Sequence, residues 1–147
     1  MGAWGIGPFE DDHACDLLAD IYDCEDKISF FQNELEIINP DDELDYDSGT
    51  VAIVLGAILD AVLCKTEYNY GFFDESESGE EIQVPFLEWA NKLDPEQLLP
   101  FVDKIVTMLQ RLLAEESELR ELWAETEYFP NWKKQYEEMI ARLEPHR

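Results

Sequence analysis

Basic residues are scarce in this chain. Its 147 residues hold ten Lys and Arg against 35 Asp and Glu, which gives a formal net charge of −25. Residues 1–91 contain 23 acidic residues against Lys27 and Lys65, a net charge of −21, whereas residues 92–147 carry only −4. Such a surface repels nucleic acid and anionic lipid and attracts cationic proteins. The composition therefore argues against nucleic-acid and membrane-surface binding, and it favours a basic protein as partner.

Cysteine and histidine are also few. The three cysteines are odd in number and form no Cys-x-x-Cys pair, so they indicate neither a disulfide framework nor a zinc site. His13 has no orienting third group in the sequence, and scattered carboxylates do not define a catalytic pair. We therefore expect no catalytic residue, no metal site and no cofactor. We expect the protein to be a binding protein and not an enzyme.

Long hydrophobic runs and targeting signals are missing as well. The longest apolar run covers residues 51–59 and continues after Asp60 to residue 64, which is short for a bilayer span. The first residues have neither a basic region nor an apolar core typical of a signal peptide. We therefore expect a cytoplasmic protein that does not contact a membrane.

The apolar residues that are present follow a helical period. Apolar residues make up 46% and aromatic residues 12% of the chain, which is enough for a core. The pattern predicts an all-α fold, a single compact domain over residues 1–147, with six or seven helices around a central apolar helix. The β-branched residues of that central segment also permit a strand, but its length favours a helix. The expected helices begin after Asp11 or Asp12, cover residues 28–38 and 50–65, follow Pro85, run from Pro95 with a kink at Pro100, and follow Ser117 and Pro130.

An acidic segment over residues 41–49 precedes the central helix, which we expect Ser48 to cap. We interpret the segment as a loop with three alternative roles: a solvated charge run, a docking surface for a basic partner, or a calcium loop. The calcium alternative is weak because Gly56 stands where a calcium loop needs its bidentate glutamate. Its candidate partner-binding residues are Asp41, Asp42, Glu43, Asp45 and Asp47.

A second segment, residues 68–81, mixes aromatic and acidic side chains. Gly79 and two serines predict a loop. Exposed aromatic residues ringed by acids are typical of an interface for a basic protein, whereas the alternative buries the aromatic residues in the core. Its candidate partner-binding residues are Tyr70, Phe73, Asp74, Glu75, Glu77, Glu80 and Glu81.

The first nine residues are Met-Gly-Ala-Trp-Gly-Ile-Gly-Pro-Phe, followed by Asp12, Ala14 and Asp16. This opening resembles that of the bacterial domain-of-unknown-function family 4259. The likeness continues through the small-residue helix at 51–64, the segment around Trp89 and residues 111–123, so it covers most of the chain. The family has no established active site, so no functional residue is carried over. Small acidic relatives of this kind resemble immunity proteins encoded beside bacterial toxins.

Charge and resemblance together give the functional expectation. We expect an immunity protein that forms a heterodimer with a cationic nuclease toxin, preferably a ribonuclease, and occludes its active-site cleft. The alternative is a cytoplasmic adaptor or regulatory protein that binds a basic partner with no toxin involved.

Overall fold

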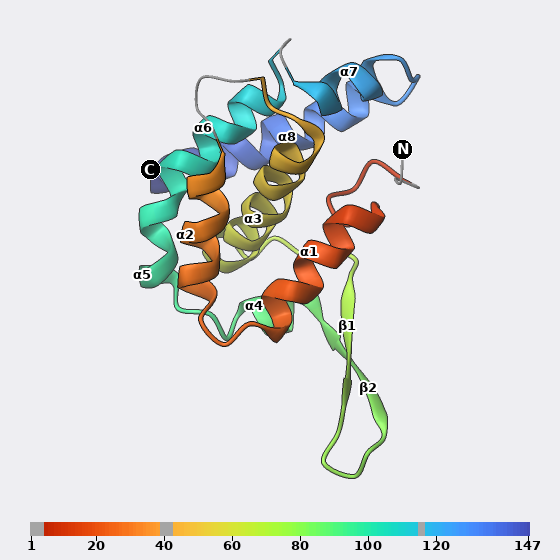
Figure 1. Cartoon of the computed structure of the whole chain (residues 1–147), viewed down its shortest axis with the longest axis vertical. Helices are drawn as coiled ribbons and strands as arrows, with labels where there is room; N and C mark the ends of the chain where they lie inside the picture. Colours follow the sequence, from red (N-terminus) through yellow and green to blue (C-terminus); the bar gives the residue numbers. More distant parts are fainter. Residues whose placement is uncertain (1–4, 39–42, 115–116) are drawn as a thin grey trace.

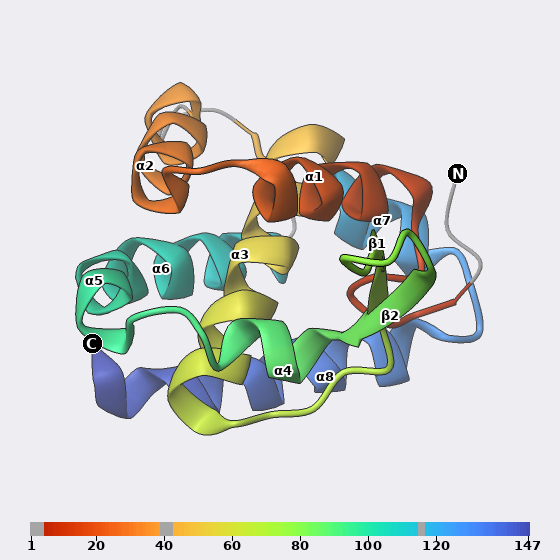
Figure 2. The same ribbon diagram turned by 90° about the horizontal axis from the view of Figure 1, so that it is seen from below.

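A central helix organises the fold. The computed structural model describes residues 5–38, 43–114 and 117–147. Helix α3 (Tyr46–Cys64) is buried over every residue from Gly49 to Val62. Helices α1 (Asp12–Asp23) and α2 (Lys27–Ile37) cover one side of it, α8 (Phe129–Leu143) covers the opposite side, and α6 (Val102–Leu112) lies beside it (Figures 1 and 2). This arrangement confirms the predicted central apolar helix.

Small residues allow the neighbours of α3 to approach closely. A Cβ atom added at Gly56 would lie 3.0 Å from the Met139 sulfur of α8 and 3.1 Å from a Leu109 methyl carbon of α6. A larger side chain at this position would therefore require the side chains of Met139 and Leu109 to shift. Among the described residues, α3 is also the one helix long and apolar enough to cross a membrane. Because 78% of that segment is buried inside the fold, it has the environment of a core helix.

Most predicted helix starts are confirmed. Asp11 caps α1 by accepting from the His13 amide, Asp94 caps α5 (Pro95–Leu98), and Ser117 caps α7 (Glu118–Ala124). The predicted break at Pro100 is a 3₁₀ turn, η1 (Leu99–Phe101), between α5 and α6. The remaining helical elements are α4 (Phe86–Ala90), directly after Pro85, and the 3₁₀ turn η2 (Glu144–His146). These starts are set by local capping, which a sequence displays directly.

The predicted start of α3 is wrong by several residues. The helix begins at Tyr46, and its cap is Asp45, whose carboxylate accepts from the Ser48 amide at 2.8 Å. Residues 46–49 are therefore helical, so the predicted acidic loop over 41–49 does not exist as such. A helical Asp47 also rules out the loop geometry that the calcium alternative requires.

The prediction of a helical fold is confirmed, but all-α overstates it, because the predicted loop over residues 68–81 contains a strand. Strand β1 (Gly71–Glu75) pairs antiparallel with β2 (Glu81–Pro85) in a two-stranded sheet. The register aligns Phe73 with Gln83 and Asp74 with Ile82. The described part of the chain is thus mostly helical, with one β-hairpin between α3 and α4.

One buried ion pair fixes the end of α3 that leads to the hairpin. Asp60 is 0% exposed, and its carboxylate lies 2.9 and 2.7 Å from the Nε and Nη2 atoms of Arg142 on α8. It also accepts from the hydroxyls of Thr66 at 2.9 Å and Tyr68 at 2.6 Å. The cluster of donors compensates for burial of the charge. It ties α3, α8 and the segment entering β1 to one another.

Candidate partner-binding site

The hairpin of residues 71–85 projects away from the helical body (Figure 1). Its turn is closed by hydrogen bonds from the Ser76 amide to the Glu80 carbonyl at 2.8 Å and from the Gly79 amide to the Ser76 carbonyl at 2.9 Å. Gly79 has a φ of +83°, a conformation that a residue without Cβ adopts at no steric cost. The turn therefore holds the acidic tip in a defined shape.

Aromatic packing anchors the base of the hairpin. Phe72 is buried and stacks on Tyr22 of α1, with ring centroids 4.2 Å apart, and it meets Trp89 of α4 edge-on at 5.0 Å. Tyr70, one of the predicted contact residues, is half-buried and packs on Phe9 at 5.3 Å. Burial of these rings supplies the apolar contacts that an isolated two-stranded hairpin lacks. Phe72 and Tyr70 thus position the hairpin and leave little of their own surface for a partner.

A hydrogen bond reinforces the anchor further out on the hairpin. The Tyr22 hydroxyl donates to the Asp74 carboxylate at 2.6 Å. This bond raises the pKa of Tyr22 to about 12 and lowers the pKa of Asp74, since it favours the neutral phenol and the ionised carboxylate. Asp74 therefore stays charged in a fixed orientation on the face that turns toward α1.

The opposite face of the hairpin is open. Side chains alternate along a strand, and directly paired residues share a face, so Phe73, Glu75, Glu81 and Gln83 all lie on this outer face. Phe73 is 71% exposed, the second most exposed of the large apolar side chains in the described ranges after Ile37. A shallow hollow beside it is lined by Asn69, Tyr70, Gly71, Phe73, Gln83 and Pro85. An exposed phenyl ring next to a hollow offers a partner an anchor point.

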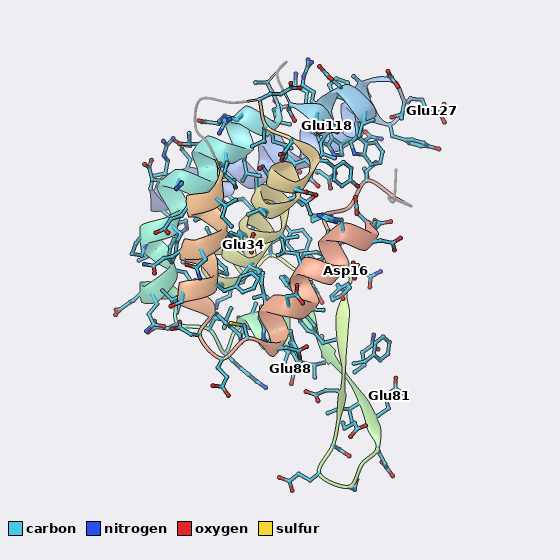
Figure 3. The ribbon with its side chains drawn as sticks, viewed as in Figure 1. Asp16, Glu34, Glu81, Glu88, Glu118 and Glu127 are labelled. Atoms are coloured by element: carbon cyan, nitrogen blue, oxygen red, sulfur yellow. The ribbon has the colours of Figure 1, made fainter. Side chains whose placement is uncertain are left out.

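Negative charge surrounds this apolar point. Residues 71–85 contain no Lys or Arg, and their five carboxylates are Asp74, Glu75, Glu77, Glu80 and Glu81, all on exposed residues. Figure 3 shows Glu81 projecting from β2 away from the helices, with Glu88 of α4 near the base of the hairpin. The same figure labels carboxylates on α1, α2 and α7, so the hairpin adds a protruding site to a generally acidic surface.

The other predicted contact segment has a mainly structural environment. Asp41 and Asp42 lie outside the described residues, and Glu43 is exposed. Asp45 caps α3, and Asp47 lies 2.7 Å from the Nε2 atom of His13 on α1. Tyr46 adds two contacts: its hydroxyl donates to Asp11, and its amide donates to Glu118 of α7 at 2.8 Å.

The structure therefore does not bring the two predicted segments together. Residues 43–47 lie at the α7 end of the molecule, whereas the hairpin projects from the opposite end (Figure 1). Asp74, Glu75, Glu77, Glu80, Glu81 and Phe73 do share the hairpin, with Tyr70 at its base. One docking surface containing all the predicted residues is not formed.

Sequence reasoning missed three residues of this site. Ile82, which is 43% exposed, and Gln83 lie on β2, and Tyr22 anchors the hairpin from α1. The alternation of Ile82 and Val84 around a polar residue was a strand signal, and Ser78-Gly79 was a turn signal between two strands. No local signal points to Tyr22, because its partner Asp74 is 52 residues away in the chain.

The hairpin presents groups suited to contact with another protein. Within residues 5–38, 43–114 and 117–147, no group of three or more His, Cys, Asp and Glu side chains is placed to hold a metal ion. The hairpin offers instead an aromatic anchor, a ring of carboxylates and exposed backbone, which are features of protein interfaces.

Comparison with known proteins places the chain by family. A family model described as Domain of unknown function (DUF4259) matches residues 2–135. Comparisons with curated proteins and with solved structures gave no match.

Proposed function

Because this chain belongs to the DUF4259 family, whose description assigns no function, we propose a function from the candidate site: the protein binds and neutralises a basic protein. The partner we infer is a cationic bacterial nuclease toxin, preferably a ribonuclease, which would make this chain a cytoplasmic immunity protein and not an enzyme. The observation that carries the proposal is the projecting hairpin, on which an exposed Phe73 stands among five carboxylates with no basic residue.

Electrostatics supports a cationic partner. A nuclease cleft is lined with basic groups that bind phosphates, and an acidic protrusion fits such a cleft in place of the substrate. The charge of −21 on residues 1–91 would attract the cationic nuclease over a long range, with an association rate constant of about 10⁸–10⁹ M⁻¹s⁻¹ at low salt. Rapid capture suits a protein that has to act before the toxin cleaves nucleic acid.

Preorganisation supports a specific interaction. Asp74 is held by Tyr22, and the backbone of the turn is held by hydrogen bonds of Gly79 and Ser76, so one carboxylate and the backbone that carries the others are positioned before a partner arrives. A rigid binding element loses less conformational entropy on association than a flexible acidic tail. Phe73 would supply the apolar contact that distinguishes one partner from basic proteins in general.

The decisive experiment produces the full chain together with the product of the neighbouring open reading frame, isolates what binds, and assays it for nuclease activity. We expect a one-to-one complex, stoichiometric loss of nuclease activity, and affinity that falls steeply with salt. Assays on RNA and on DNA identify the class of nuclease. Capture of abundant basic proteins only, all released at moderate salt, would contradict the immunity role and support the adaptor alternative.

A charge-reversal pair tests whether the hairpin is the contact. The triple variant Glu75→Lys, Glu77→Lys, Glu80→Lys should abolish inhibition, because each reversal replaces an attraction with a repulsion at the interface. The matched control reverses three exposed glutamates near α7, at the other end of the molecule, Glu121, Glu125 and Glu127. The control changes net charge equally and should weaken association only through the long-range field. Equal loss in both variants would rule out the hairpin as a specific site.

A further inference from the structure

The backbone of the hairpin has one strand edge that is open for pairing. Hydrogen bonds link the Phe86 amide to the Tyr70 carbonyl at 2.9 Å and the Ser76 amide to the Glu80 carbonyl at 2.8 Å. In an antiparallel ladder, hydrogen-bonded and non-hydrogen-bonded pairs alternate. The pairs Gly71–Pro85, Phe73–Gln83 and Glu75–Glu81 are therefore non-hydrogen-bonded. Their N–H and C=O groups point outward, away from the partner strand. The Glu75 N–H is already taken, because it donates to the Asp74 carboxylate at 2.8 Å, so Gly71 and Phe73 supply the outward N–H groups of β1 that remain for pairing.

The two outer edges differ at the base of the hairpin. On β2 the outward position nearest the body is Pro85, which has no N–H, and helix α4 begins at the next residue. A strand added along β2 would meet that helix. On β1 the outward position nearest the body is Gly71, preceded by residues 65–70, which are neither helix nor strand. No helix directly adjoins this end of β1, so β1 has the accessible edge. On the outer face, the Gln83 side chain fills the space beside Gly71, 2.7 Å from where a Cβ atom would lie.

Charge determines which strand the edge accepts. A second copy of this hairpin would place carboxylates against carboxylates, so pairing between copies is disfavoured. If an extended segment with Lys or Arg at alternate positions paired with β1, its basic side chains could lie on the outer face, where they would contact Glu75. In a register shifted by one residue, the same side chains would lie on the inner face and contact Asp74. An apolar residue of the same segment would reach Phe73 and the hollow beside it.

From this geometry we propose that the hairpin binds its partner by β-strand addition: an extended, basic segment of the partner protein pairs with the β1 edge through the backbone of Gly71 and Phe73. This inference rests on the proposed function, since it specifies how the same hairpin engages a basic protein. Backbone pairing supplies affinity, and the carboxylates and Phe73 select the sequence of the added strand.

The test uses the full chain and a capped octapeptide in which lysine and valine alternate, with a glutamate–valine peptide as charge control. Amide hydrogen exchange followed by NMR should show new protection at Gly71 and Phe73 with the lysine peptide. Glu81 and Gln83, on the other edge, should stay unprotected, and the glutamate peptide should not bind. Protection at Glu81 and Gln83 alone would overturn the choice of edge.

Proline variants separate the backbone from the side chain. Phe73→Pro removes an outward N–H without breaking a ladder bond, so it should weaken peptide binding about fivefold beyond Phe73→Ala, as expected for one lost hydrogen bond. Gln83→Pro and Gln83→Ala form the matched pair on β2 and should bind equally well.

The outcomes also distinguish this inference from the proposed function. Binding at the hairpin without protection of Gly71 or Phe73, or equal affinity of the two Phe73 variants, overturns strand addition and leaves the proposed function standing. Absence of peptide binding overturns strand addition as well. If strand addition is seen but no nuclease is inhibited, the proposed function fails and the edge remains a binding site for basic strands.

Discussion

Asp60 illustrates how much a single buried charge depends on its partners. Its carboxylate is fully buried and accepts from Arg142, Thr66 and Tyr68. The pKa of Arg142 is raised, mainly by its hydrogen bond to Asp60, and burial raises the pKa of Tyr68. Both shifts favour the ion pair with a protonated tyrosine beside it. The cluster therefore has a structural role, and the charge state of each group depends on its hydrogen-bond partners.

Replacing Asp60 should destabilise the fold more than replacing the exposed carboxylate of another ion pair. We expect Asp60→Asn to lower the free energy of unfolding by about 2–3 kcal/mol, because a fully buried carboxylate that accepts several hydrogen bonds is lost, while the Arg142 side chain, 37% exposed, stays partly hydrated. The control is Asp103→Asn, which breaks the pair with Arg147 at 2.8 Å, where the Asp103 side chain is 72% exposed. That change should cost less than about 1 kcal/mol. Urea denaturation of both variants measures the difference, and similar midpoints would contradict the argument.

The Tyr22–Asp74 hydrogen bond predicts that the free energy of unfolding falls both at high pH and at low pH. Tyr22 has a pKa of about 12 in the folded chain against an ordinary value near 10. Its contribution is therefore fully present below pH 10 and is lost as the pH rises toward 12. The pKa of Asp74 is lowered, so its contribution is present above about pH 4, its ordinary value, and is lost as the pH falls through its folded pKa.

Tyr22→Phe should remove this dependence. Between pH 10 and 12 the stability of the wild type should fall more steeply than that of the variant, because only the wild type has the Tyr22 phenol, whose proton is retained in the folded chain and released on unfolding. Tyr46 and Tyr68 have raised pKa values in both proteins and provide a common background. Denaturant midpoints at pH 9 and pH 11 measure the two slopes, and parallel curves would show that the bond makes no difference to stability.

At the scale of elements, α3 depends on its small residues. Gly56 faces Met139 and Leu109 at contact distance, so Gly56→Val should overpack the centre and cost about 1–3 kcal/mol. The control Gln110→Val introduces the same β-branched residue at an exposed position of α6 and should cost less than about 1 kcal/mol. Thermal melts of the two variants provide the comparison. Because valine has a higher helix propensity than glycine, a loss at Gly56 no larger than the loss at Gln110 would contradict overpacking.

Elements defined by local chemistry were predictable, and those defined by distant contacts were not. The caps Asp11, Asp94 and Ser117 lie beside the amides that they accept, so the sequence displays them. The cap of α3 is Asp45, three residues before the predicted Ser48, and contacts of Tyr46 with Asp11 and Glu118 favour the earlier start. The hairpin was missed for two reasons. Its acidic, serine-rich turn is typical of a loop, and the aromatic contacts of Phe72 with Tyr22 of α1 and Trp89 of α4 join residues that no local pattern connects.

The arrangement of the predicted contact residues was not predictable for the same reason. The acidic residues among them that the structure describes are exposed, and composition suffices to identify groups such as Asp74 and Glu81 as surface residues. Composition does not specify that these residues project on a hairpin or that Asp47 is engaged by His13. Those facts follow from tertiary packing, which separates residues 43–47 from the hairpin.

At the scale of the whole molecule, the charge of −25 opposes compaction. We expect sodium chloride to stabilise the protein, because screening weakens repulsion among carboxylates that are crowded on residues 1–91. A rise of about 4 °C in Tm between low and physiological salt would correspond to roughly 1 kcal/mol. Calorimetry at fixed pH measures the shift, and a Tm that falls with added salt would contradict self-repulsion.

The pairing of Asp60 with Arg142 also constrains how the chain is made. The two residues are 82 positions apart, so a chain leaving the ribosome exposes the whole of α3 long before the counter-charge of Asp60 has been synthesised. Until then, burying α3 would enclose an unpaired carboxylate. Arg142 also lies beyond residue 135, where the family match ends. A fragment cut at that boundary would lack Arg142, the counter-charge of Asp60 on the central helix, so we expect it to be less stable than the full chain.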